Sequence, residues 1–335
     1  MIRLAYRDPR RSVVAVRLEP ALPMEPVAFS RNGSTWQAGF AAPPVQRLEY
    51  LLEIEHRNGR VERVPDPGNP LRAPGPFGDK SVLELPGYSP PRWLAAGPPR
   101  GEIVELTVRS RPFRRDVQVR LWSAAGTSPG EVVPLLVVHD GPETDEYGSL
   151  SLFLDQLVAT DRVRPFRAAL LAPIDRDDHY SASAAYARTL AWDVLPALPS
   201  PRRRHHRVGM GVSLGALAML HAHRRHPDLF GGLFLQSGSF FRAATDRQER
   251  AFPRFDRISR FVGKVLRDSE GDPVPVAMTC GAAEENLANN RAVARSLRRQ
   301  GYDVRFAEVP DAHTWAGWRD AWDPWLAGLL AQVWR

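Results

Sequence analysis

The chain is poor in three features that would otherwise narrow its class. It has a single cysteine, Cys280, so no disulfide can form within it. No uncharged apolar run approaches the roughly 20 residues of a membrane-spanning helix. Residues 1–10 lack the apolar core of an export signal. We therefore expect a cytoplasmic globular protein with no membrane partner.

Lysine is also scarce, because only Lys80 and Lys264 occur in the chain. Lysine and arginine together number 45 against 38 acidic residues, so the net charge of +7 comes almost entirely from arginine. Compositional bias explains such an excess as well as an anionic partner does. We find no basic helix, no aromatic and basic RNA motif and no fixed-period repeat. Nucleic acid is not expected, whereas an anionic small substrate remains open.

The length of 335 residues is sufficient for two domains. Residues 1–95 contain strand-length apolar or alternating runs at 12–18 and 48–55, with turn signals at Asn32-Gly33 and Asn58-Gly59 and no helical period. We predict a β-sandwich domain there. Tracts rich in proline and glycine at 64–78 and 86–93 then lead to a second domain, residues 96–335.

The second domain alternates strands with helices. Residues 103–108 and 116–122 predict an antiparallel pair at a sheet edge, and the apolar run 133–138 predicts a buried parallel strand. Further strands are expected near 167–173, 207–210, 231–235, 273–279 and 303–308, with helices near 150–160, 183–195, 287–299 and at the C-terminus. This order predicts an α/β fold with a doubly wound, mostly parallel sheet, whose active residues lie at the carboxyl ends of the strands.

A candidate nucleophile lies in Gly211-Val-Ser-Leu-Gly215, a G-x-S-x-G pattern. The pattern alone is weak in a chain with 25 glycines, but a strand is predicted before it and a helix after it. That context indicates a nucleophile elbow, which exposes the Ser213 hydroxyl and lets the N–H of Leu214 donate to an oxyanion. The alternative is a glycine-rich strand–helix turn in another α/β fold.

An α/β-hydrolase triad runs serine, acid, histidine along the chain. Four histidines follow Ser213, and three of them lie on the helix that begins at the elbow, too close in sequence to reach back to it. His313, after the last predicted strand, is therefore the candidate base. Its alternative reading is a polar loop histidine.

The acid is expected after the strand that ends at Thr279, where Glu284 and Glu285 occur. A carboxylate there would fix the imidazole tautomer and stabilise the imidazolium. Glu284 is favoured and Glu285 is its competitor. Either side chain could instead begin the next helix, where an acid suits the helix dipole.

The second oxyanion N–H is expected in the loop after the strand 133–138, where Gly141 permits close backbone approach. Its neighbour Asp140 is expected to be structural or to face the substrate. The segment 242–267, rich in arginine and phenylalanine, predicts either a site for an anionic or aromatic ligand or a solvated amphipathic helix. His221 and His223 face different sides of a helix, so neither a metal nor a cofactor is expected.

Together these residues resemble the enterochelin (ferric enterobactin) esterase-like proteins of the esterase D superfamily. The resemblance rests on short motifs spread over nearly the whole chain: Trp36, 65–70, 77–81, 86–88, 91–93, 139–141, Asp175, Tyr180, 211–215, 236–239, Gly281, Glu284, His313, Trp315 and Trp318. It implies an α/β-hydrolase domain preceded by an immunoglobulin-like β-sandwich. It also implies substrate-binding roles for Asp140, Tyr180 and Trp315.

Two departures from the family pattern are visible. Asp178-His179-Tyr180 replaces a common Glu-Tyr pair, and the closing motif is Asp311-Ala-His rather than Gly-Gly-His.

We expect a serine esterase acting on the ester backbone of a catecholate siderophore. The alternatives are an esterase for carbohydrate or aryl esters, of feruloyl or acetyl type, and a non-catalytic ligand-binding protein.

Overall fold

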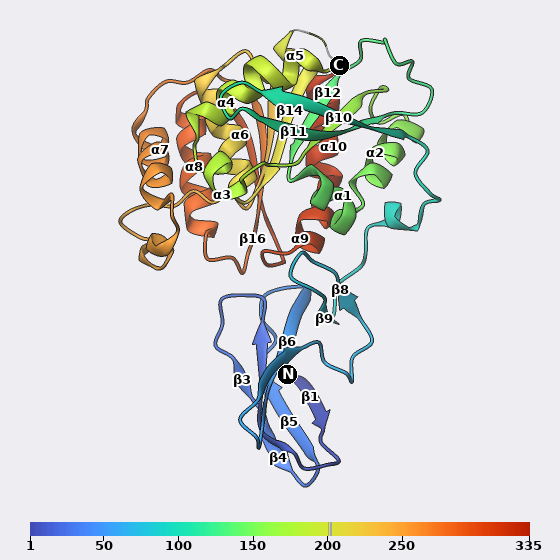
Figure 1. Ribbon diagram of the computed structural model, residues 1–335, viewed down its shortest axis with the longest axis vertical. Coiled ribbons are helices and arrows are strands. Elements are labelled where there is room, and N and C mark those ends of the chain that lie inside the picture. The colour runs from blue at the N-terminus through green and yellow to red at the C-terminus, as the bar shows by residue number, and fades with distance from the viewer. Residues whose placement is uncertain (200, 202) are drawn as a thin grey trace. The chain divides into compact units, whose positions relative to one another are not determined.

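The computed structural model describes residues 1–199, 201 and 203–335, which divide into two compact units (Figure 1). Unit 1 contains Met1–Pro90 together with two short segments from much later in the chain, Gly281–Glu285 and Val309–Gly317. Unit 2 contains Pro91–Cys280, Asn286–Glu308 and Trp318–Arg335. The sequence predicted the two regions, but it gave no sign that late segments join the first.

Unit 1 is built from two antiparallel sheets. One has the strand order β1-β5-β4, and the other has the order β3-β2-β6-β9-β8 with β7 paired to β6. Their strands are β1 (Ile2–Arg7), β2 (Val13–Pro20), β3 (Val27–Ala28), β4 (Ser30–Asn32), β5 (Thr35–Phe40), β6 (Arg47–His56), β7 (Val61–Val64), β8 (Arg72–Ala73) and β9 (Lys80–Glu84). The predicted turns are present, since Gly33 and Gly59 both have positive φ.

The two sheets share one apolar core. Side chains on β5 alternate, with Trp36, Ala38 and Phe40 buried and their neighbours more exposed. They belong to the same cluster as Leu48 and Tyr50 of β6. A face-to-face pair of sheets with one shared core is the β-sandwich that the sequence predicted.

Unit 2 is organised around an eight-stranded sheet with the order β10-β11-β13-β12-β14-β15-β16-β17. Its strands are β10 (Glu102–Ser110), β11 (Arg115–Ser123), β12 (Leu135–His139), β13 (Arg167–Leu171), β14 (Arg207–Val212), β15 (Gly232–Gln236), β16 (Pro275–Gly281) and β17 (Asp303–Val309). β10 pairs antiparallel with β11 at the edge, and β13, β12, β14, β15 and β16 run parallel. The predicted doubly wound sheet with an antiparallel edge is confirmed.

Helices cover both faces of this sheet (Figure 1). One face packs mainly against α4, α6, α7 and α8, and the other against α2 and α10. The helices are α1 (Gly141–Gly148), α2 (Leu150–Ala159), α3 (Arg176–Tyr180), α4 (Ala184–Thr189), α5 (Leu195–Ala197), α6 (Leu214–Arg225), α7 (Phe255–Arg267), α8 (Leu287–Arg299), α9 (Trp315–Asp320) and α10 (Trp322–Val333). The predicted helix at 183–195 is divided, because a π-helical turn at Leu190–Val194 separates α4 from α5.

None of the helices in the described residues is both long and apolar enough to cross a bilayer. Strands β12, β13, β14 and β15 are wholly buried, because helices cover both faces of the parallel sheet. Loops at the carboxyl ends of these strands are therefore where polar groups can reach a ligand.

Candidate active site

Ser213 lies at the sharp turn between β14 and α6. Its backbone has φ 53° and ψ −122°, a conformation that residues with side chains rarely adopt. The turn is held in place because the Ser213 N–H donates to the carbonyl oxygen of Gln236, at 2.9 Å. This is the strained strand–helix turn that the G-x-S-x-G pattern predicted.

The two glycines of the pattern are required by packing. A Cβ atom on Gly211 would come within 2.4 Å of the carbonyl carbon and oxygen of Gly215, both backbone atoms that cannot move aside. A Cβ atom on Gly215 would lie 3.0 Å from the Cβ of His139. The β14 strand and the first turn of α6 therefore approach more closely than any residue with a side chain allows.

The Ser213 hydroxyl is partly accessible and has a second serine beside it. Its oxygen lies 3.1 Å from the Oγ of Ser239, and the Ser239 N–H donates to the Ser213 carbonyl oxygen at 3.1 Å. Sequence reasoning quoted Ser239 only as part of a motif and gave it no role. Its position in the loop that follows β15, the neighbour of β14, was the available signal.

The two predicted oxyanion donors both lie at helix N-termini. Leu214 is the first residue of α6 and Gly141 is the first residue of α1, and N–H groups in the first turn of a helix have no acceptor within that helix. Gly141 also packs closely, since a Cβ there would lie 2.3 Å from the Cα of Leu170. These donors keep the role predicted for them as a hypothesis.

Asp140 and Tyr180 are enclosed by protein, and the substrate contact expected of them remains a prediction. Asp140 is 3% exposed and Tyr180 is fully buried. The Asp140 carboxylate accepts from Nε and Nη2 of Arg176 at 2.7–3.0 Å, and the Asp140 N–H donates to the Tyr180 hydroxyl at 3.2 Å. Both side chains hold the turn before α1. Arg176 was missed, although it follows β13 as Asp140 follows β12.

His139 belongs to the same buried cluster and has no free role as a base. Its Nδ1–H donates to the carbonyl oxygen of Gly215 at 2.9 Å, and its ring stacks on Tyr180 at 4.6 Å. Burial lowers the pKa of His139 to about 4, so the ring is neutral near pH 7. It joins the end of β12 to the start of α6.

His313 and Glu284 form a hydrogen-bonded pair in unit 1. Nδ1 of His313 lies 2.6 Å from Oε2 of Glu284, while Oε1 of Glu284 accepts the N–H of Gly281 at 2.7 Å. The Glu284 side chain is 3% exposed, that of His313 is 42% exposed, and Glu285 is at the surface. When Nδ1–H is donated to the carboxylate, the lone pair of the neutral ring lies on Nε2. Glu284, rather than Glu285, is therefore the carboxylate bonded to His313.

The three predicted triad residues follow strands of one sheet. Ser213 follows β14, and the loops with Glu284 and His313 follow β16 and β17. Helix α8 joins β16 to β17, which is the crossover connection that parallel strands require. Trp315, expected to contact substrate, begins α9 and is half-buried; its role remains a prediction.

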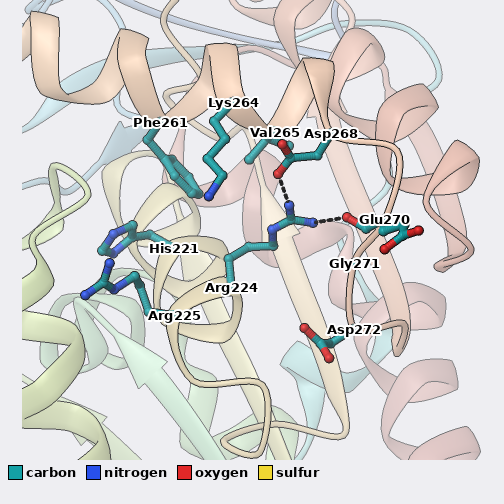
Figure 2. A pocket seen from close by; sticks show the side chains of 10 residues that line it. All are labelled: His221, Arg224, Arg225, Phe261, Lys264, Val265, Asp268, Glu270, Gly271 and Asp272. Atoms are coloured by element: carbon teal, nitrogen blue, oxygen red, sulfur yellow. Dashed lines mark hydrogen bonds and ion pairs between the residues drawn. The ribbon is translucent and has the colours of Figure 1, made fainter.

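A separate pocket of about 460 Å³ lies at the C-terminal end of α6 (Figure 2). It lies eight or more residues along the helix from Ser213, which is about 12 Å. Arg224 is paired there with Asp268, and the three cations and three carboxylates balance one another. The lining residues are His221, Arg224, Arg225, Phe261, Lys264, Val265, Asp268, Glu270, Gly271 and Asp272.

Helix α7 supplies part of this pocket, so the segment 242–267 includes pocket-lining residues as well as an amphipathic helix. Its ligand role stays a prediction. The nearby histidines contact protein groups. His221 meets Phe261 edge-on at 5.0 Å, and Nε2 of His223 bonds to the carbonyl of Asp272. Across residues 1–199, 201 and 203–335, no three potential ligands gather into a metal-binding group.

A model of the Esterase family matches residues 110–329, more than half of the chain. The chain belongs to the Esterase family. The match covers the turn at Ser213 and the loops that contain Glu284 and His313.

Individual relatives agree with this assignment. The iron(III) enterobactin esterase of Escherichia coli O6:H1 is 27% identical over 212 residues, which are 60% of this chain and 52% of that protein. The chain thus aligns with about half the length of that curated relative. Two solved structures share the fold over 99% of this chain: the enterobactin esterase of Shigella flexneri in the presence of enterobactin (TM-score 0.79, 21% identity, 92% of that chain) and the ferric enterobactin esterase of Salmonella typhimurium (TM-score 0.80, 18% identity, 93% of that chain).

A ferulic acid esterase is similar over a smaller part. It covers 71% of this chain and 99% of its own length, with a TM-score of 0.58 and 18% identity. The α/β-hydrolase domain preceded by a β domain, expected from the resemblance, is confirmed by these likenesses.

Proposed function

We propose that this chain of the Esterase family hydrolyses carboxylic esters with Ser213 as nucleophile, His313 as base and Glu284 as the acid that orients the base. The observation that carries the proposal is the 2.6 Å contact between His313 Nδ1 and the Glu284 carboxylate. A neutral histidine with its tautomer fixed in this way has Nε2 available to accept a proton. The strained turn at Ser213 supports the same mechanism.

The reaction proceeds in two steps. The Ser213 oxygen attacks the ester carbonyl carbon while His313 Nε2 takes the hydroxyl proton, and the N–H groups of Leu214 and Gly141 stabilise the oxyanion. His313 then gives that proton to the departing alcohol, which leaves an acyl group on Ser213. Water, deprotonated by His313, then attacks the acyl carbonyl carbon; the bond to the Ser213 oxygen breaks, His313 returns the proton to that oxygen, and the acid leaves. Glu284 stays ionised and stabilises the imidazolium in each step.

We propose the ester backbone of a catecholate siderophore as the substrate. The curated relative is an iron(III) enterobactin esterase, and one solved structure with this fold was determined with enterobactin. The net charge of +7 agrees in sign with the anionic iron complex that such a siderophore forms. Because the chain has a single cysteine, Cys280, and can form no internal disulfide, we place the reaction in the reducing cytoplasm.

An aryl or carbohydrate esterase is the second candidate, favoured by the likeness to a ferulic acid esterase. The deciding experiment measures turnover of ferric enterobactin, a feruloyl ester and a short p-nitrophenyl ester, with wild type and Ser213→Ala. We expect ferric enterobactin and the p-nitrophenyl ester to be cleaved, and Ser213→Ala to lower kcat about a million-fold.

The matched control for that experiment is Ser239→Ala, which removes the neighbouring hydroxyl and leaves the nucleophile intact. We expect it to retain labelling by a fluorophosphonate probe, which Ser213→Ala loses. Cleavage of the feruloyl and p-nitrophenyl esters alone would contradict the siderophore assignment and keep the esterase. Ligand binding without turnover or labelling would instead indicate a non-catalytic binding protein.

A further inference from the structure

The two loops that carry the acid–base pair are packed into the β-sandwich, far from them in the sequence. Gly281–Glu285 and Val309–Gly317 both belong to unit 1, although the strands β16 and β17 that lead into them belong mainly to the sheet of unit 2. The proposed mechanism does not explain why these two loops pack against the β-sandwich.

Each loop contributes an alanine to the sandwich core, and each alanine directly precedes a member of the pair. Ala312, before His313, is 3% exposed and belongs to the cluster formed by β2, β5 and β6. Ala283, before Glu284, is half-buried against the same cluster. A side chain one residue away from Ala283 or Ala312 cannot move far while the alanine stays packed.

The loops are also bonded to the sandwich and to each other through backbone groups. The N–H of Gln46, just before β6, donates to the carbonyl oxygen of Pro310 at 2.7 Å, and the Gln46 carbonyl accepts the N–H of Leu85 at 2.9 Å. Between the loops, the N–H of Ala282 donates to Val309 at 2.7 Å. The backbone N–H and carbonyl groups of Gln46 therefore connect the histidine loop with Leu85, the residue that follows β9.

The histidine loop has its own internal brace at Asp311. One oxygen of its buried carboxylate accepts the N–H of Ala312 at 2.7 Å and the hydroxyl of Thr314 at 3.3 Å, and that hydroxyl accepts the N–H of Gly317 at 3.0 Å. These bonds make residues 311–317 a rigid turn. A rigid turn moves as one body, so its attachment to the sandwich sets the position of His313.

We infer that the β-sandwich is a positioning element for the base: the Gln46 N–H and the Ala312 methyl group hold the histidine loop so that His313 stays bonded to Glu284. This inference rests on the proposed function of the pair. Gln46 and Ala312 are positioning residues that act through His313. The sandwich then contributes to the rate of the chemical step and not to substrate affinity alone.

The test uses the full-length chain with Gln46→Pro, which removes the N–H donor to Pro310, and Gln46→Ala, which keeps it. A base displaced by about 1 Å loses roughly 10²-fold in rate. We expect Gln46→Pro to lower kcat by roughly 10- to 100-fold with KM within about twofold, and Gln46→Ala to match wild type. In parallel, the far-downfield NMR signal of the His313 Nδ1 proton should broaden or vanish only in Gln46→Pro.

A second variant and a second control separate positioning from stability. Ala312→Leu overfills the same contact and should reproduce the loss of kcat and of the proton signal. Ile54→Ala weakens the same core eight residues further along β6, about 27 Å from Gln46, and should lower stability while leaving kcat unchanged. This pair remains informative if Gln46→Pro does not fold.

Either of two results would overturn the inference. One is wild-type kcat and an intact proton signal in Ala312→Leu, or in a folded Gln46→Pro. The other is an equal loss of kcat in Ile54→Ala, which would indicate general destabilisation. If wild type cleaves no ester at all, the proposed function fails by itself, and the His313 proton signal still decides whether the sandwich positions the pair.

Discussion

The proposed nucleophile and the proposed acid–base pair are held by different kinds of structure. Ser213 is held by nearby parts of the chain in unit 2: a buried strand, two glycines and the first turn of a helix, with hydrogen bonds to Gln236 and Ser239. His313 and Glu284 lie on loops in unit 1, where contacts with residues more than two hundred positions away hold them. The comparison teaches that the turn holding Ser213 is encoded by nearby residues, whereas His313 is held by residues far away in the sequence.

Among the variants that test this comparison, we expect the largest loss of kcat when Glu284 is neutralised. Glu284→Gln removes the charge that stabilises the His313 imidazolium, and it should lower kcat by roughly 10⁴-fold, less than the loss of the serine. Glu285→Gln is the matched control, since Glu285 is exposed, and it should stay within about twofold of wild type. Steady-state kinetics on a p-nitrophenyl ester would measure both. Equal losses in the two variants would reassign the acid.

Lowering the pH should destabilise unit 2 more than unit 1. Burial lowers the pKa of His139, His221 and His223 to about 4, and all three lie in unit 2. Between their ordinary value of 6.5 and about 4 the unfolded chain binds more protons than the folded one. The free energy of unfolding of unit 2 therefore falls as pH falls, by about 1.4 kcal/mol per histidine per pH unit.

Unit 1 should withstand the same change. Hydrogen bonds from Arg17 and from His56 hold the pKa of Glu53 and of Glu62 below the ordinary 4.5. Their contribution is complete above 4.5 and is lost only as pH falls through the lowered values. Hydrogen exchange at pH 7, 6 and 5 should show β12–β15 losing protection before β2 and β6. Simultaneous loss in both units would refute this, and His221→Gln should make the decline of unit 2 shallower.

The smallest of these effects tests the glycine packing at the turn that holds Ser213. Gly211→Ala places a methyl group against the backbone of Gly215, and should destabilise unit 2 by roughly 1–3 kcal/mol and lower kcat. Gly328→Ala, in α10 with nothing within 4 Å of the added atom, should instead stabilise it by about 0.5–1 kcal/mol. Thermal or urea unfolding measures both. An unchanged Gly211→Ala would show that the elbow tolerates expansion.

Several features could be predicted from the sequence because short-range patterns determine them. The apolar runs of β12, β13 and β14 indicate buried strands, and the glycines around Ser213 indicate a tight turn, since strand burial and backbone strain depend on neighbouring residues. The order of strands and helices then placed Ser213 and the loops with Glu284 and His313 after strands of one sheet.

Other features needed the tertiary structure. The choice of Glu284 over Glu285 depends on which carboxylate faces His313, and the sequence favoured Glu284 but left Glu285 open. Asp140 is hydrogen-bonded to Arg176 and Tyr180, which lie about 40 residues further along the chain, and no sequence motif predicts these contacts. Long-range packing decides such contacts, because it brings together residues whose spacing along the chain carries no signal.

The sequence by itself therefore determined the parallel sheet, the sandwich and the strained turn at Ser213, because periodicity and glycine sterics act over a few residues. Only the tertiary structure decided that Ala283 and Ala312 enter the core of the sandwich. An alanine in a loop is compatible with burial or exposure, and its environment is set by a domain more than two hundred residues away.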